Sequence, residues 1–189
     1  FTGSTPVGRS IMTEAARHLT RVTLELGGKS PCIVHEDAGL KYGIKRIAWG
    51  KFFNAGQTCI APDYVLIHRK IKDDFVERMI GTIFSFYGED PMKSPDYARI
   101  VNERHLNRLV NLMKNGRILY GGKYLSKDLY LSPTIIDQVS PDEPLMQEEI
   151  FGPLLPIIEY SDIEEAIAFV NQRPRPLALY CFSENREIQ

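Results

Sequence analysis

The alternation of short apolar runs with segments of helical periodicity constrains the fold of this chain more than any other feature. Parallel strands need a crossover connection, usually a helix, before the next strand can pair, so this alternation is typical of α/β proteins. The sequence therefore predicts an α/β fold with a mostly parallel sheet and flanking helices.

Segments in which apolar residues return at helical spacing are expected as helices at about residues 6–18, 40–53, 71–87, 102–114 and 161–171. Short apolar runs are expected as strands at about residues 21–26, 31–35, 64–68, 118–120, 131–136, 154–160 and 177–182. Ser161 and Glu164 have the spacing of a capping box at the start of the last helix. Beyond about residue 20 we expect one domain.

Composition excludes several classes of protein. Of the 189 residues, 43% are hydrophobic and 25% are charged, which excludes a disordered tail, a collagen-like fibre and a disulfide-rich miniprotein. The net charge of −1 gives no electrostatic reason to expect binding to nucleic acid or to an anionic membrane. No window approaches the run of roughly twenty apolar residues that a membrane span needs.

The cysteines and the two ends of the chain add two expectations. Three cysteines that lie far apart in the sequence favour a reducing compartment over a disulfide framework. Residues 1–5 resemble the end of a buried strand that enters a turn, and residues 183–189 resemble the start of a helix. We therefore expect the chain to be a piece of a longer protein.

Cys59 is the first candidate for chemistry. It lies in the run Asn54–Pro62, a loop of small and polar residues between an expected helix and an expected strand. The functional interpretation is a thiolate nucleophile that attacks an electrophilic carbon. The alternative is a small buried hydrophobe, because free cysteine is among the most buried residue types. For Cys32 and Cys181, which lie inside apolar strands, this alternative is preferred.

Glu25 is the second candidate, near the end of an otherwise apolar strand that Gly27 and Gly28 follow. A carboxylate is costly to bury without a purpose, and the two glycines leave room for a ligand. Glu25 could therefore be a general base with a pKa raised by desolvation. The alternative is a Glu25 that pairs with Lys29 or is solvated. An acyl intermediate on Cys59 would need such a base to activate water.

Two further segments are candidates for binding. In Gln147–Pro153, the adjacent acids Glu148 and Glu149 could bind a sugar diol while Phe151 packs on a ring; the alternative is a solvated acidic turn with one core Phe. In Gly3–Gly8, backbone N–H groups at a strand-to-helix turn could meet a phosphate, although the spacing is not G-x-G-x-x-G.

The histidines do not add a site of their own. They are scattered, no Cys/His set has metal-ligand spacing, and no metal is expected. His68 is the histidine nearest to Cys59 in the sequence, but a strand separates them, and a Cys–His dyad has no positive support.

Four motifs in order, F-T-G-S-T-x-x-G, L-E-L-G-G-K-S-P, G-Q-T-C and E-E-I-F-G-P, closely resemble those of the aldehyde dehydrogenase superfamily. The resemblance covers essentially the whole chain. The run G-Q-T-C-I-A-P-D-Y, with Asp63 and Tyr64 after the proline, looks most like the class 3 and fatty aldehyde dehydrogenase branch.

This resemblance implies roles for the candidate residues, namely Cys59 as nucleophile, Glu25 as general base, Glu149 at the nicotinamide ribose, Phe151 beside the nicotinamide, and Gly3, Ser4 and Gly8 at the cofactor phosphates. The backbone N–H of Cys59 would be half of an oxyanion hole, whose other half, an Asn side chain in this family, lies upstream of Phe1. Residues 1–20 would be the C-terminal part of a Rossmann-like NAD(P)-binding domain, and residues 21–189 a catalytic domain that is incomplete at its C-terminus.

The implied activity is the oxidation of medium-chain, long-chain or aromatic aldehydes to carboxylic acids with NAD or NADP, through a cysteine thiohemiacetal and a thioester. The parent protein is expected to be a cytoplasmic homodimer, or to attach to the cytosolic side of a membrane through a segment outside this chain. The alternatives are a catalytically inactive fragment or homologue, a cysteine-dependent ester hydrolase, and a CoA-acylating relative.

Overall fold

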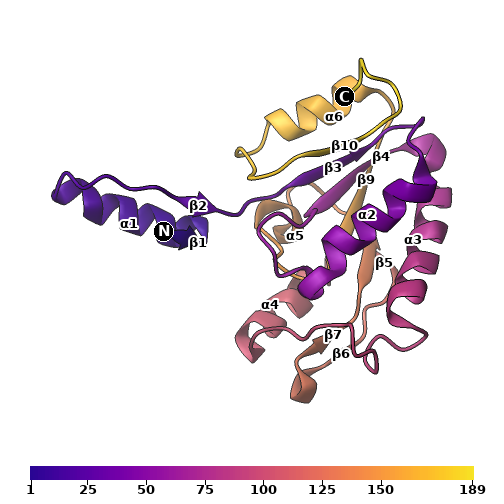
Figure 1. Cartoon of the computed structure of the whole chain (residues 1–189), viewed down its shortest axis with the longest axis horizontal. Coiled ribbons are helices and arrows are strands. Elements are labelled where there is room, and N and C mark those ends of the chain that lie inside the picture. Colours follow the sequence, from indigo (N-terminus) through magenta and orange to yellow (C-terminus); the bar gives the residue numbers. More distant parts are fainter.

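A six-stranded sheet organises the structure, a computed structural model that describes residues 1–189 (Figure 1). The strand order is β10-β3-β4-β9-β8-β5, and all neighbours are parallel except β5 and β8. Its strands are β3 (Pro31–Val34), β4 (Tyr64–His68), β5 (Arg117–Tyr120), β8 (Thr134–Asp137), β9 (Leu154–Tyr160) and β10 (Tyr180–Phe182). The expected α/β fold with a mostly parallel sheet is confirmed.

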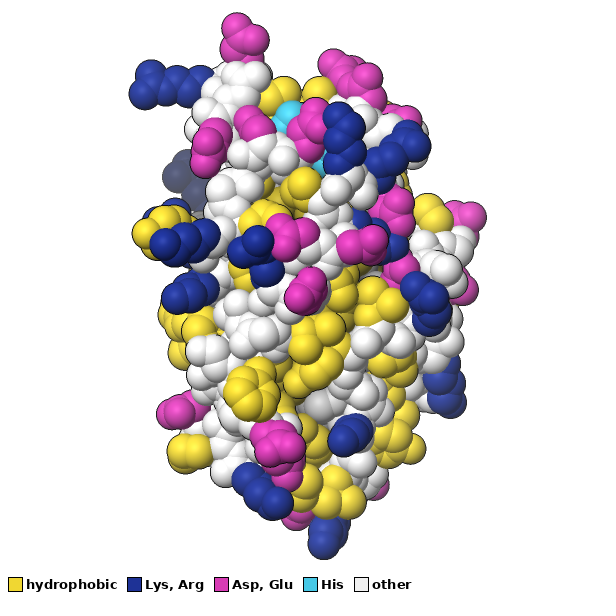
Figure 2. Space-filling view, turned by 90° about the vertical axis from the view of Figure 1, so that its right-hand side faces the viewer, with side chains coloured by type: hydrophobic (Ala, Val, Ile, Leu, Met, Phe, Trp, Pro, Cys, Tyr) yellow, Lys and Arg dark blue, Asp and Glu magenta, His cyan; other side chains and the backbone are white.

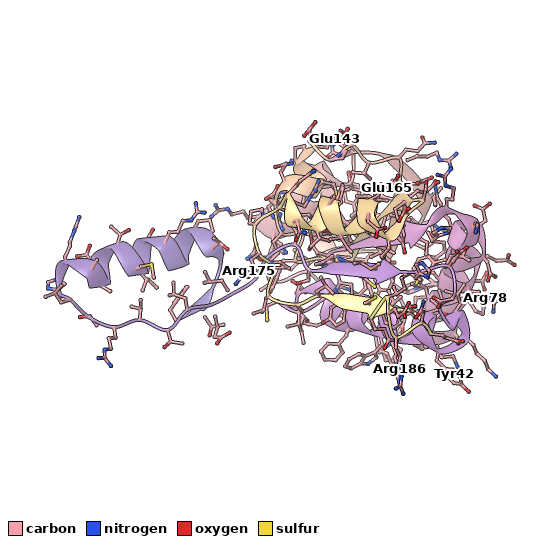
Figure 3. All side chains as sticks on the ribbon, turned by 90° about the horizontal axis from the view of Figure 1, so that it is seen from above. Tyr42, Arg78, Glu143, Glu165, Arg175 and Arg186 are labelled. Atoms are coloured by element: carbon pink, nitrogen blue, oxygen red, sulfur yellow. The ribbon has the colours of Figure 1, made fainter.

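Helices cover both faces of this sheet. The main helices are α2 (Leu40–Phe52), α3 (Lys72–Tyr87), α4 (Glu103–Leu112) and α6 (Ile163–Asn171), with a short α5 (Pro144–Gln147). The chain runs from β3 through α2 to β4 in one direction across the sheet, and from β9 through α6 to β10 in the other. Right-handed crossovers therefore place α6 on the face opposite α2 and α3, as Figure 3 shows from above.

The first 26 residues form a separate lobe that projects from the sheet (Figure 1). It contains β1 (Thr2–Gly3), α1 (Thr5–Arg17) and β2 (Glu25–Leu26), and β1 pairs with β2 in parallel. The strand expected at residues 21–26 is therefore only two residues long, because its partner β1 has only two residues. Gly8 is the one fully buried residue of α1.

Two other expectations change for local reasons. The strand expected at residues 131–136 is broken at Pro133, which has no N–H to donate, so that β7 (Tyr130–Leu131) pairs with β6 (Tyr124–Leu125) while β8 joins the main sheet. The last helix begins one residue later than its capping box predicts. Asp162 is the N-cap, and its carboxylate accepts the N–H of Glu164 at 3.3 Å.

One cluster of 35 buried residues forms the core between the sheet and its helices. Cys32 belongs to it and is fully buried, as expected, whereas Cys181 is half-buried because β10 is an edge strand. Acidic and basic side chains are interspersed on the face of the molecule shown in Figure 2. None of the helices is both long enough and apolar enough to cross a membrane.

Candidate active site

Three of the four motifs lie in segments that lead into neighbouring strands of the main sheet. The Gly27–Ser30 segment leads into β3, the loop of Cys59 leads into β4, and the Glu149–Pro153 segment leads into β9. Because these strands are adjacent and parallel, their amino ends lie side by side at one edge of the sheet. The candidate site is therefore at the amino edge, whereas open α/β sheets usually bind ligands at the carboxyl edge.

Cys59 lies at the second position of a β-turn. The turn is closed by the N–H of Ala61, which donates to the carbonyl of Thr58 at 3.0 Å. The Cys59 side chain is partly exposed and its sulfur makes no hydrogen bond. The N–H groups of Cys59 and Ile60 donate to no acceptor within the chain. The turn thus presents a reachable thiol together with free backbone donors, and the alternative of a buried hydrophobe does not hold for Cys59.

The approach to this turn requires a left-handed backbone. Asn54, Ala55 and Gly56 have φ values of 51°, 52° and 72°. A Cβ on Gly56 would lie 2.3 Å from the carbonyl oxygen of Gly152, so only glycine fits there. The glycine of G-Q-T-C thus packs directly on the glycine of E-E-I-F-G-P.

The side chain of Gln57 connects the start of the turn to residues 99–101 by hydrogen bonds. Its side-chain amide donates to the carbonyls of Asn54 and Arg99, both at 3.0 Å, and its carbonyl accepts the N–H of Val101 at 2.9 Å. Every hydrogen bond of this side chain goes to backbone, which suits a residue that holds the loop in place.

The carboxylate of Glu149 rests against the glycine pair. A Cβ on Gly27 would meet the Glu149 carboxylate, which would have to move to make room for it. Burial raises the pKa of Glu149, and the N–H of Gly28 partly opposes this rise. Glu149 is half-buried rather than solvated, so the acidic-turn alternative fails for this residue.

A buried ion pair joins the three segments. Lys29 pairs with Asp63, and their side chains are only 9% and 5% exposed. Lys29 also donates to the carbonyls of Leu145 and Glu148, at 2.8 and 3.0 Å. Asp63 Oδ1 accepts the N–H of Ile150 at 2.9 Å.

The pairing of Lys29 corrects one of the sequence-based alternatives, since Lys29 binds Asp63 and not Glu25. The Lys29–Asp63 pair was not predicted from the sequence. Its only signal was a lysine and an aspartate that each lie within two residues of the start of a strand.

Lys51 lies beneath the same loops and was also missed. It is 1% exposed, on the last turn of α2. Burial lowers its pKa to about 8, with the nearby Lys29 acting in the same direction and Asp63 and Glu149 opposing.

Phe151 borders an open hollow of about 620 Å³. Phe151 is 37% exposed, so it is not the core residue of its motif; Ile150 is, with no exposed surface. The carbonyl of Phe151 accepts from His105 Nε2 at 2.7 Å. Arg108 donates to the Glu148 carboxylate at 3.0 Å and to the carbonyl of Glu149 at 3.1 Å.

The remaining candidates lie in the projecting lobe. Gly3 pairs with Leu26, and a Cβ on Gly8 would lie 2.8 Å from the Leu26 side chain. Ser4 is the N-cap of α1 and makes no side-chain capping bond. Glu25 is exposed, so the expectation of a buried carboxylate at this position is wrong, and its carboxylate makes no hydrogen bond to Cys59.

Comparisons with known proteins agree with this arrangement. The sequence profile of the aldehyde dehydrogenase family matches residues 1–188. The chain is 51% identical over 188 residues to the dimeric NADP-preferring aldehyde dehydrogenase of Mus musculus, covering 100% of this chain and 42% of that protein. It is 50% identical over 188 residues to aldehyde dehydrogenase family 3 member A2 of Mus musculus, covering 100% of this chain and 39% of that protein.

A solved structure of Staphylococcus aureus AldH in a substrate-bound state superimposes with a TM-score of 0.97 at 49% identity, covering 100% of this chain and 42% of that one. The chain thus spans about two fifths of the length of the relatives it matches. As the four ordered motifs predict, it belongs to the aldehyde dehydrogenase family, with family 3 members among its relatives.

Proposed function

We propose that this chain carries the nucleophile and part of the cofactor site of an enzyme that oxidises aldehydes to carboxylic acids with NAD or NADP. One observation carries the proposal. The amino edge of the sheet holds the Cys59 thiol, the free N–H groups of Cys59 and Ile60, and the segment of Glu149 that leads into β9. The NADP preference in the name of one relative supports the cofactor class.

The residues beside Phe151 fit such a cofactor. The hollow combines an exposed aromatic ring with the cationic side chain of Arg104, which suits a ligand with a ring and negative charge. Glu149 and Phe151 would hold the nicotinamide riboside, and Gly3, Ser4 and Gly8 would face the phosphates. Bound there, NAD(P)+ supplies the acceptor for the hydride of the aldehyde.

In this proposal, the side chains and backbone of the loop perform the covalent steps. The Cys59 thiolate adds to the aldehyde carbon, and the oxyanion of the resulting thiohemiacetal is stabilised by the Cys59 N–H. After oxidation to the thioester, Glu25 accepts a proton from water, which attacks the acyl carbon and releases the carboxylic acid with the thiol restored.

The division of the chain follows as a proposal of its own. We assign the β1–α1–β2 lobe to the cofactor-binding domain and the six-stranded sheet to the catalytic domain. The boundary then lies at Gly27 rather than near residue 20, because β2 pairs with β1 and not with the main sheet. We also propose, from the dimeric relative, that the whole protein is a homodimer in the cytoplasm or on the cytosolic side of a membrane.

The test measures NADH or NADPH formation from medium- and long-chain aldehydes by the full-length polypeptide. Cys59→Ala is expected to lose activity by at least about a thousandfold, because no other group replaces the nucleophile. Cys181→Ala, which removes a half-buried thiol outside the site, is the matched control and should keep full activity. Full activity in Cys59→Ala would refute the nucleophile assignment.

Glu25→Gln tests the second role. This variant should form the thioester and release one equivalent of reduced cofactor per site, and then turn over slowly while acyl-enzyme accumulates. Steady-state turnover equal to the wild type would remove Glu25 from the mechanism. Ester hydrolysis without any cofactor-dependent oxidation would favour the hydrolase alternative instead.

A further inference from the structure

Tyr180 reaches the nucleophile turn from the far end of the sequence. It is the first residue of the edge strand β10, and its neighbour across the ladder is Cys32 of β3. Its hydroxyl donates to the carbonyl of Ile60 at 2.6 Å, across 120 positions of sequence. Ile60 directly follows the candidate nucleophile, so this bond links β10 to the turn itself.

The bond from Tyr180 completes the restraint of one peptide group. The group between Ile60 and Ala61 is held at its carbonyl by Tyr180 and at its N–H by the carbonyl of Thr58. Thr58 in turn shares a peptide group with the N–H of Cys59. In a trans peptide the carbonyl and the N–H point in opposite directions, so a Thr58 carbonyl directed into the turn leaves the Cys59 N–H directed out of it.

The hydroxyl of Tyr180 keeps its proton over the ordinary pH range. Burial raises its pKa, and the neighbouring thiols of Cys32 and Cys59 add to the rise. A phenol that stays protonated remains a donor to the Ile60 carbonyl.

We propose that Tyr180 is a positioning residue, whose hydroxyl fixes the Ile60 carbonyl and thereby holds the Cys59 N–H where it can stabilise an oxyanion. The proposal rests on the function proposed above for Cys59. Tyr180 acts through the turn and has no contact with the reacting atoms in this role.

Tyr180→Phe in the full-length polypeptide tests the proposal, because it removes only the hydroxyl. The loss of one hydrogen bond that orders the site should lower kcat for aldehyde oxidation by about three- to tenfold, with KM for the cofactor unchanged within about twofold. Hydrogen exchange in a peptide covering residues 57–63 should accelerate by a similar factor, because the Ala61 N–H loses part of its protection.

Tyr160→Phe is the matched control. The Tyr160 hydroxyl also donates to a backbone carbonyl, that of Val34 at 3.3 Å. This bond lies at the carboxyl ends of β9 and β3, whereas Cys59 lies at the amino ends of the strands. This variant should keep both the wild-type kcat and the wild-type exchange rate of residues 57–63.

If Tyr180→Phe has the kcat and the hydrogen-exchange rate of the wild type, the proposal is overturned. Equal losses of kcat in Tyr180→Phe and Tyr160→Phe would also overturn it, because they would indicate a general structural effect. The wild type could instead fail to oxidise aldehydes while Tyr180→Phe, but not Tyr160→Phe, shows faster exchange. That result would confirm the link between Tyr180 and the turn and would refute the proposed function.

Discussion

At the scale of single residues, a buried ion pair and its hydrogen bonds join the loops of the candidate site. The two carboxylate oxygens of Asp63 bind different partners, since Oδ2 pairs with Lys29 and Oδ1 accepts the Ile150 N–H. Such a buried pair stabilises only when both partners are present, because a single buried charge is costly. Lys51, with Asp63 and Glu149 nearby, completes a nearly neutral group of charges beneath the loops.

Lys51 leads to a prediction about pH. Its pKa is about 8 in the folded chain and its ordinary value is 10.5, so between these pH values the unfolded chain binds more protons than the folded one. The contribution of Lys51 to the free energy of unfolding should therefore rise with pH across this window, by on the order of 3 kcal/mol. Lys51→Met removes the group and should flatten this rise. Urea unfolding at several pH values measures both curves.

Lys45→Met provides the control, since Lys45 is an exposed lysine on the same helix. Its unfolding free energy should follow the wild type at every pH. Parallel curves for wild type and Lys51→Met would contradict the prediction.

At the scale of elements, glycines set how closely the motif loops approach one another. Gly56 meets the Gly152 carbonyl at a distance that excludes a side chain, and Gly27 meets the Glu149 carboxylate, which would have to move to admit one. These contacts connect segments that precede different strands. Strand order thus brings the motifs together, and glycine allows the loops to touch.

Gly56→Ala should destabilise the chain by about 2 to 4 kcal/mol, because it combines a left-handed backbone with a clash against a backbone carbonyl. Gly81→Ala is the same change in α3, where a Cβ meets nothing within 4 Å, and should stabilise by about 1 kcal/mol through helix propensity. Urea or thermal unfolding of the two variants compares them directly. A Gly56→Ala variant at least as stable as the wild type would show that the Gly56 contact is not restrictive.

At the scale of the whole molecule, the sheet and the projecting lobe differ in how they are held. The strands β3 and β4 are buried along their whole length. In the lobe, α1 buries only Gly8, and the strands β1 and β2 have only two residues each. Few buried contacts imply local opening at low free energy.

Amide hydrogen exchange of this 189-residue chain should therefore separate the two parts. The amides of residues 8–17 in α1 should exchange at least about a hundredfold faster than those of β4, because the helix opens without unfolding the sheet. Mass spectrometry of exchanged peptides measures this difference. Equal protection of α1 and β4 would show that the lobe is held as firmly as the core.

Much of the fold follows from local pattern. The apolar run at Tyr64–His68 and the periodicity of α3 specify a strand and a helix whatever surrounds them, because burial of one run or one stripe is enough to decide the element. Predicted element bounds were wrong where a single group decides them. Pro133 has no N–H and divides the strand expected at residues 131–136, and Asp162 rather than Ser161 caps the last helix.

The sequence by itself determined the family, the α/β class and the identity of the candidate residues, because these depend on residue types and on their order. The tertiary structure decided which of them meet: it brings Cys59, Glu149 and Gly27 to the amino edge of β3, β4 and β9, and leaves Glu25 in the lobe. It also decided the partners of Lys29 and Tyr180, which lie 34 and 120 positions away. The physical reason is that pairing over such separations depends on strand order and on burial, and the residues next to either partner do not specify these.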